Sequence, residues 1–82
     1  MTVYHIQFWR AGDQIIDYED DEYRSLDDAR LYIEQLIREM MADRWSEDWT
    51  GCRFEVTTSG GRTVLSVPVL ATMSTLARRT HH

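Results

Sequence analysis

Two hairpin-like segments flank a single helical pattern in this chain, and that order constrains the fold more than any other feature. The first segment spans residues 3–18 and turns at residues 11–13. The second spans residues 52–70 and turns at residues 59–62. Between them, apolar residues recur at helical spacing over residues 26–44. This order predicts a β-β-α-β-β domain, a kind of fold that hosts many unrelated functions.

Alternation identifies the first strand and its two faces. The apolar face carries Tyr4, Ile6 and Phe8, and the opposite face carries His5, Gln7 and Trp9. A period of two residues is typical of a strand with one buried side. We expect residues 14–18 to form a short second strand. It ends in an acidic loop at residues 19–22, because like charges discourage regular pairing there.

The second hairpin shows the same alternation. We expect the third strand at residues 52–57. One of its faces carries Cys52, Phe54 and Val56, and the opposite face carries Arg53, Glu55 and Thr57. The Gly60-Gly61 pair predicts a tight turn. Residues 63–70 form the fourth strand, with Leu65, Val67 and Val69 on its core face. Because Pro68 has no backbone N–H, this strand is expected at an edge of the sheet or only partly paired.

The helical segment carries a start signal and a buried stripe. Ser25 is a suitable N-cap, and Asp28 three residues later approximates a capping box. The buried stripe consists of Leu26, Ala29, Ile33, Leu36, Ile37 and Met40. Glu34 and Arg38 are spaced for an ion pair worth roughly 0.2–0.5 kcal/mol.

These patterns together predict an α+β fold. Two β-hairpins flank one amphipathic helix, and a four-stranded, mainly antiparallel sheet carries the helix on one face. One helix covers only one face, so the opposite face is either hydrated or occupied by another subunit. We expect a single domain at residues 1–70 and a weakly structured C-terminal tail at residues 71–82. We assign no role to His81 or His82.

Composition narrows the functional classes. The chain has 82 residues, 43% of them hydrophobic, which favours one folded domain with a marginal core. Its formal net charge is −5, and acids are concentrated in residues 13–28, so nucleic-acid binding is disfavoured. No apolar run approaches the roughly 20 residues that span a membrane. The N-terminus lacks the features of a signal peptide, so we expect a cytoplasmic protein without membrane attachment.

Neither a catalytic set nor a metal site emerges from the residue pattern. Cys52 and His5 are the one conceivable nucleophile–base pair, but alternation places them on opposite faces. The acidic segment partly matches a calcium loop starting at Asp17. Its sixth position is Glu22 instead of glycine, and no helix precedes it. We therefore expect a non-enzymatic protein that uses no cofactor.

The candidate partner surface combines tryptophans with acidic residues: Trp9, Trp45, Trp49, Asp20, Asp21 and Glu22. Tryptophan is enriched where partners contact each other most strongly. The alternative, which the usual burial of tryptophan favours, is that these rings close the end of the core.

A set of motifs occurs in order over residues 3–70. It comprises an aromatic strand at 4–8, Gly12-Asp13, an acidic stretch at 17–22, a helix entry at 25–30, and strands at 52–57 and 61–68. In this order the motifs resemble a small family of single-domain proteins of unknown function, abundant in alphaproteobacteria. The resemblance implies the element order and supplies no catalytic residues. Members of that family often carry Glu-Gly in the acidic loop, where this chain has Asp20-Asp21-Glu22.

The leading hypothesis is a domain that acts through protein–protein contacts as a homodimer. An alternative is an acidic regulatory inhibitor, antitoxin-like or nuclease-blocking, whose carboxylates cover a basic surface. A further alternative is a small-ligand or metal-binding module at the acidic loop.

Overall fold

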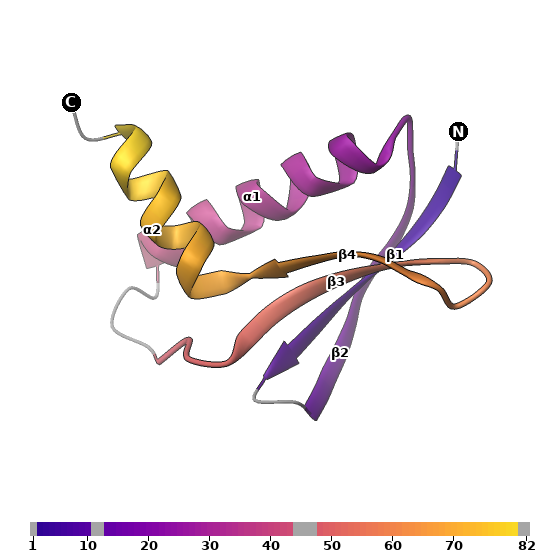
Figure 1. Cartoon of the computed structure of the whole chain (residues 1–82), viewed down its shortest axis with the longest axis horizontal. Helices are drawn as coiled ribbons and strands as arrows, with labels where there is room; N and C mark the ends of the chain where they lie inside the picture. The colour runs from indigo at the N-terminus through magenta and orange to yellow at the C-terminus, as the bar shows by residue number, and fades with distance from the viewer. Residues whose placement is uncertain (1, 11–12, 44–47, 81–82) are drawn as a thin grey trace.

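Six elements follow one another along the chain (Figure 1). The computed structural model describes residues 2–10, 13–43 and 48–80, with the backbone alone at 13–20, 43 and 80. The elements are β1 (Thr2–Arg10), β2 (Asp13–Tyr23), α1 (Leu26–Asp43), β3 (Cys52–Thr58), β4 (Thr63–Pro68) and α2 (Val69–Thr80). The predicted β-β-α-β-β order is confirmed, and α2 is added after it. Ala11, Gly12, Trp45, His81 and His82 lie outside the described residues.

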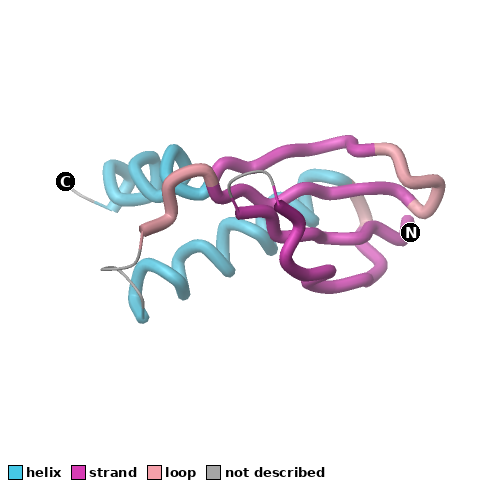
Figure 2. The backbone as a smooth tube through the Cα atoms, turned by 90° about the horizontal axis from the view of Figure 1, so that it is seen from below, coloured by secondary structure: helices cyan, strands magenta, loops and turns pink. Residues whose placement is uncertain are grey.

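The four strands form one antiparallel sheet in the order β2-β1-β3-β4, and they lie side by side in Figure 2. The β1–β2 hairpin crosses the β3–β4 hairpin at an angle in Figure 1, as expected from the twist of antiparallel sheets. Strands β1 and β3 occupy the centre, although the whole of α1 separates them in sequence. Pro68 ends β4, which is an edge strand, so the edge position predicted from its missing N–H is confirmed.

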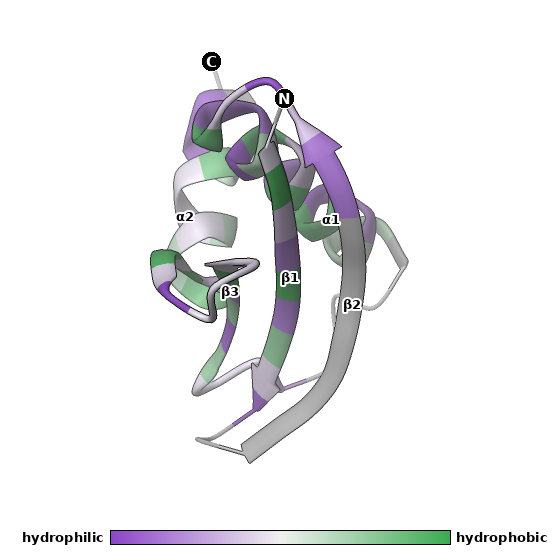
Figure 3. Ribbon diagram, turned by 90° about the vertical axis from the view of Figure 1, so that its right-hand side faces the viewer, coloured by the Kyte–Doolittle hydropathy of each residue, from purple (hydrophilic) through white to green (hydrophobic). Residues whose placement is uncertain are grey.

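The core lies between one face of the sheet and the two helices. Figure 3 shows hydrophobic and hydrophilic bands alternating along β1, which is the pattern of a strand with one buried side. The central strands contribute Ile6, Phe54 and Val56 to the core, all with at most 1% of their surface exposed. The helices cover them with Ala29, Ile33 and Ile37 from α1 and Val69, Met73 and Leu76 from α2. Tyr4 and Phe8 pack against this core, as predicted.

Strand β2 corrects one expectation. The predicted acidic loop at residues 19–22 is part of β2, which continues to Tyr23 and pairs with β1 as far as Thr2. Pairing with β1 supplies the backbone hydrogen bonds, and β2 lies at the edge of the sheet, where Asp21 and Glu22 are exposed. Like charges along β2 therefore do not prevent it from pairing with β1, whose sequence contains no acidic residue.

Helix α2 corrects a second expectation. Residues 69–80 form a regular helix instead of a weakly structured tail, and β4 ends at Pro68 instead of Leu70. Val69 is buried as predicted, but from the first turn of α2. Proline fits the start of a helix, where its missing N–H is not needed. The buried residues Val69, Met73 and Leu76 are spaced four and three residues apart, which is the spacing of one helical face.

The β3–β4 turn is confirmed. The N–H of Gly61 donates to the carbonyl oxygen of Thr58 at 2.8 Å, and the N–H of Thr58 donates to that of Arg62 at 2.9 Å. Gly61 has a φ of 84°, a left-handed conformation that favours glycine.

Candidate interaction surface on the helix-free face of the sheet

The face of the sheet opposite the helices presents a row of polar and aromatic side chains from its two central strands. The register pairs Trp9 with Arg53, Gln7 with Glu55 and His5 with Thr57. Directly paired residues of antiparallel strands share a face, so these six side chains lie together. We refer to these six residues as the helix-free face. Alternation predicted which way each residue points, but only the pairing of β1 with β3 makes them neighbours.

Trp9, Arg53 and Glu55 form the most closely connected group on this face. The guanidinium carbon of Arg53 lies 5.0 Å from the centre of the Trp9 ring, within the range of a cation–π interaction. Nε of Arg53 also donates to Oε2 of Glu55 at 2.8 Å. The Arg53 and Glu55 side chains are 32% and 17% exposed. The group is thus half-buried, ordered by its own contacts, and still accessible.

The indole N–H of Trp9 is an unusual feature of this group. Nε1 is shielded from solvent, and it has no hydrogen-bond partner among the described residues. Buried polar groups in proteins are nearly always hydrogen-bonded, because an unmet donor costs about 1–3 kcal/mol. Among the described residues it is the one buried side-chain nitrogen or oxygen in this condition.

The other predicted tryptophans do not extend this surface. Trp49 is 5% exposed and packs edge-on against Phe8, with ring centres 6.4 Å apart. It therefore belongs to the core and is removed from the candidate partner surface, because a partner cannot reach a buried ring. Its position matches the alternative in which a tryptophan closes the end of the core. Trp45 lies outside the described residues.

The acidic candidates lie at the end of edge strand β2. Asp21 and Glu22 are exposed, and the N–H of Glu22 donates to Oδ1 of Asp21 at 2.8 Å. Asp20 pairs with His5 through the backbone register, and its side chain is not described. A calcium loop cannot form while residues 17–23 are extended in a strand. The described residues contain no group of three or more potential metal ligands.

Cys52 and His5 are separated as the alternation predicts. His5 is paired with Thr57 near one end of β3, whereas Cys52 is paired with Arg10 at the other end. Cys52 is buried in the core, and its Sγ lies 4.0 Å from the carbonyl oxygen of Thr50. The thiol and the imidazole therefore do not form a nucleophile–base pair.

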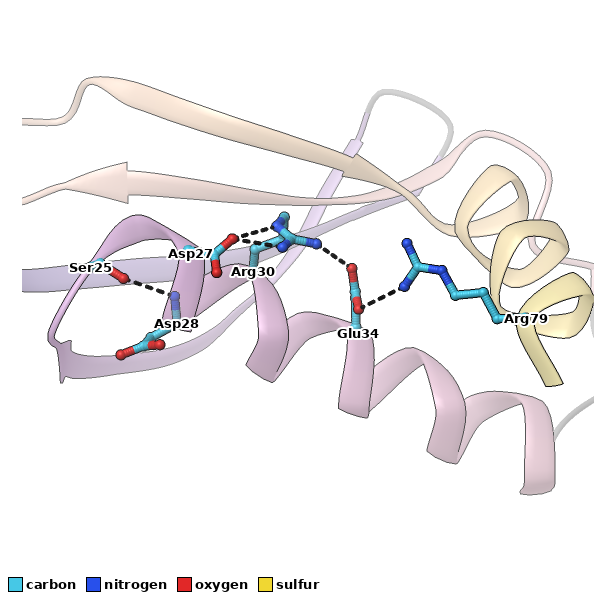
Figure 4. Close-up of polar contacts among 6 residues, drawn as sticks. All are labelled: Ser25, Asp27, Asp28, Arg30, Glu34 and Arg79. Carbon is cyan, nitrogen blue, oxygen red and sulfur yellow. Dashed lines mark hydrogen bonds and ion pairs between the residues drawn. The ribbon is translucent and has the colours of Figure 1, made fainter.

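A charged cluster joins the two helices on the other side of the molecule (Figure 4). Arg30 donates to Asp27 through Nε and Nη2, at 3.1 and 2.6 Å, and contacts Glu34 through Nη1. The hydrogen bond to Asp27 and the charges of Asp27 and Glu34 raise the pKa of the Arg30 guanidinium. Nη1 of Arg79 reaches Glu34 from α2 at 3.9 Å. Glu34 thus pairs with Arg30 and Arg79, where the sequence suggested Arg38.

The role of this cluster is to connect elements. Glu34 has 10% of its side chain exposed, and its two arginine partners come from α1 and α2. The spacing of Arg30 and Glu34 was visible in the sequence, but the contribution of Arg79 depends on the docking of α2. Neither described helix combines the length and the apolar character required to cross a bilayer.

Comparison with known proteins identifies a family that matches most of the chain. The family model described as a domain of unknown function (DUF6894) matches residues 3–71, which is most of the chain. Neither the curated proteins nor the solved structures contain a significant match. The matched residues include α1 and all of the sheet except Thr2, and they end within the first turn of α2.

Proposed function

This chain belongs to the DUF6894 family, a domain of unknown function, and we propose that it is a non-enzymatic, cytoplasmic protein-contact module. In this proposal the module forms a homodimer through the helix-free face of its sheet. The free thiol of Cys52 fits a reducing compartment, where disulfides are rare.

The Trp9 group carries this proposal. Tryptophan and arginine are both enriched among the residues that contribute most to protein interfaces, and Trp9 and Arg53 lie in contact on this face. A small domain also gains stability when a second copy buries a face that its own helices leave open.

The edges of the sheet are less suitable for self-association. Edge strand β2 carries six acidic residues and no basic ones, so two copies pairing through it would bring like charges together. Its register with β1 is interrupted twice, which further disturbs the edge. Edge strand β4 ends in Pro68, which cannot donate a ladder hydrogen bond. The helix-free face is therefore the favoured contact.

Light scattering coupled to size exclusion tests this proposal. The wild-type chain is expected to elute with the mass of a dimer at micromolar concentration, and Trp9→Ala is expected to shift it toward the monomer. Leu31→Ala is a matched control, because Leu31 is an exposed apolar residue on α1. A strictly monomeric wild type at high micromolar concentration would refute the homodimer.

The acidic inhibitor remains a second candidate because Asp21 and Glu22 are exposed at the end of an edge strand. These acidic residues are suited to contact a basic surface of a partner, because complementary charges speed association. The test is a salt-dependent pull-down from native cells with wild type and with Asp20→Asn, Asp21→Asn and Glu22→Gln combined. Recovery of the same partners by both proteins would count against this candidate.

A further inference from the structure

We propose that the acidic end of β2 binds an extended segment of another protein that is rich in arginine or lysine. The segment adds to the open edge of the sheet and places its cationic side chains on a row of tyrosines. This inference rests on the acidic-partner candidate given above and does not depend on the homodimer. It specifies the chemistry of the partner and the residues that hold it.

Residues 19–23 are a regular part of the open edge of β2. The described sheet has the order β2-β1-β3-β4, so β2 has a strand on one side only. The register with β1 shifts twice in the first part of β2, whereas residues 19–23 pair one to one with residues 2–6. A regular edge with unpaired backbone groups is a template for a further strand. This part of β2 also contains four consecutive acidic residues.

One backbone donor at this end of β2 is bonded to a side chain of its own strand. The N–H of Glu22 donates to Oδ1 of Asp21 at 2.8 Å. Aspartate side chains offer backbone donors such a local alternative to a strand partner. When a carbonyl oxygen of an added strand accepts this N–H, the Asp21 carboxylate is left for a cationic side chain.

Three half-buried tyrosines form a row beside these acidic residues. The ring centres of Tyr4 and Tyr23 lie 6.3 Å apart, and those of Tyr23 and Tyr32 lie 6.1 Å apart. Asp21 is paired with Tyr4 in the register of the sheet. Asp28 precedes Tyr32 by four residues on α1, so the two share a helix face. Guanidinium and ammonium groups are attracted to the faces of tyrosine rings, so the row favours a cationic ligand independently of the carboxylates.

The charge pattern favours a partner with consecutive basic residues. Residues 13–28 contain eight acidic residues and one basic residue, Arg24. The register places Asp21 on the side of the sheet that carries the tyrosines, and Glu22 on the opposite side. Side chains of an added strand alternate between the same two sides. Neighbouring basic residues of the partner therefore each meet a carboxylate, and opposite charges on adjacent strands stabilise the pairing.

Fluorescence anisotropy with a labelled six-arginine peptide tests the site. We expect the full chain to bind this peptide saturably at low salt, and more weakly as salt is added. The same peptide with every backbone nitrogen methylated keeps its charge but has no backbone donors. It is expected to bind at least roughly tenfold more weakly, because it cannot pair with the edge of β2. Equal binding of the two peptides would refute strand addition.

Two matched pairs of variants locate the site. Glu22→Gln is expected to weaken binding roughly two- to fivefold, whereas Glu39→Gln makes the same change at an exposed position on α1 and is expected to bind like wild type. Tyr23→Leu removes the ring and is expected to weaken binding by a similar factor. Tyr23→Phe keeps a ring face and is expected to retain the wild-type affinity. Circular dichroism verifies that each variant is folded.

The outcomes separate this site from the functions proposed above. A wild type that does not bind the six-arginine peptide refutes the site. If neutralising residues 20–22 still removes partners from the pull-down in that case, the acidic-partner candidate stands without it. Wild-type affinity in both Glu22→Gln and Tyr23→Leu also refutes the site. The homodimer is decided separately by light scattering, which involves no peptide.

Discussion

Single residues start and end the elements of this fold through local hydrogen bonds. The hydroxyl of Ser25 accepts the N–H of Asp28 at 3.2 Å, and its carbonyl oxygen accepts the N–H of Ala29 at 3.3 Å. The predicted N-cap is therefore confirmed. Before β3, the carboxylate of Asp48 accepts the N–H of Thr50 at 2.9 Å. The Ser25 hydroxyl and the Asp48 carboxylate each satisfy a backbone donor that the adjacent helix or strand leaves unpaired, and the bond from Ala29 is the first of the helix.

Loss of the Ser25 cap is expected to destabilise the protein measurably. Ser25→Ala removes the acceptor of the Asp28 N–H and is expected to lower the free energy of unfolding by about 1 kcal/mol. Urea denaturation measures the change. The control is Ser74→Ala, an exposed position within α2, where a change within about 0.5 kcal/mol is expected. Equal effects of the two substitutions would show that the cap contributes nothing.

Asp48 is expected to titrate below its ordinary value of 3.8. Hydrogen bonds from the Thr50 hydroxyl and backbone, with the charge of Arg10, lower the pKa of this carboxyl. Because the pKa of Asp48 is lower in the folded protein than in the unfolded chain, its ionised carboxylate stabilises the fold. This contribution is fully present above the unfolded pKa and is lost as the pH falls through the folded pKa. Thr50→Val, which keeps the backbone N–H, is expected to raise the pKa of Asp48. Carbon-detected NMR titration measures both proteins, and an unchanged midpoint would contradict the hydroxyl contribution.

At the scale of elements, packing determines where regular structure stops. Strand β2 continues through four consecutive acidic residues because β1 pairs with it along its length. Helix α2 forms because its apolar stripe finds a site against α1, β3 and β4. A short helix is marginal in water by itself, so contact with the core supplies its stability.

The contribution of α2 is testable with two leucines of the same helix. Leu76 is 2% exposed and Leu70 is 46% exposed. Leu76→Ala is expected to lower the free energy of unfolding by about 2–5 kcal/mol, because it leaves a cavity in the core. Leu70→Ala is expected to have an effect within about 0.5 kcal/mol. Thermal and urea denaturation give both values, and a similarly small effect at both sites would mean that α2 does not pack as described.

At the scale of the whole molecule, the chain is a two-layer structure with its helices on one side. A domain of this size buries a limited share of its surface, so its stability is small. The opposite side carries polar and aromatic residues of β1 and β3. The net charge of −5 favours solubility, while the helix-free face itself carries Arg53 and Glu55 with opposite charges.

If the folded chain is a dimer, its thermal stability depends on protein concentration. The midpoint of unfolding is expected to rise over roughly a hundredfold increase in concentration, because association removes folded monomer from the unfolding equilibrium. Differential scanning fluorimetry of wild type and Trp9→Ala is the measurement, and the variant is expected to show a flatter dependence. A concentration-independent midpoint for wild type would argue for a stable monomer.

The sequence by itself determined the order of the first five elements, the start of α1 after Ser25, the turn at Gly60 and Gly61, and the two faces of β1 and β3. These properties depend on residues that are close together in the chain. Side chains repeat their direction every 2 residues in a strand and every 3.6 in a helix, and turn residues act locally. The interaction surface was predicted only in part. The alternating pattern predicted that Trp9, Arg53 and Glu55 point away from the core. It did not show that these three side chains contact one another.

Only the tertiary structure decided the strand order, the length of β2, the helical state of residues 69–80 and the burial of Trp49. Each of these depends on contacts between segments that are distant in sequence. The pairing of β1 with β3 brings Trp9 beside Arg53, and the docking of α2 gives Glu34 its second arginine. Local patterns specify what a segment is able to form, whereas its neighbours in space select which of those forms is stable.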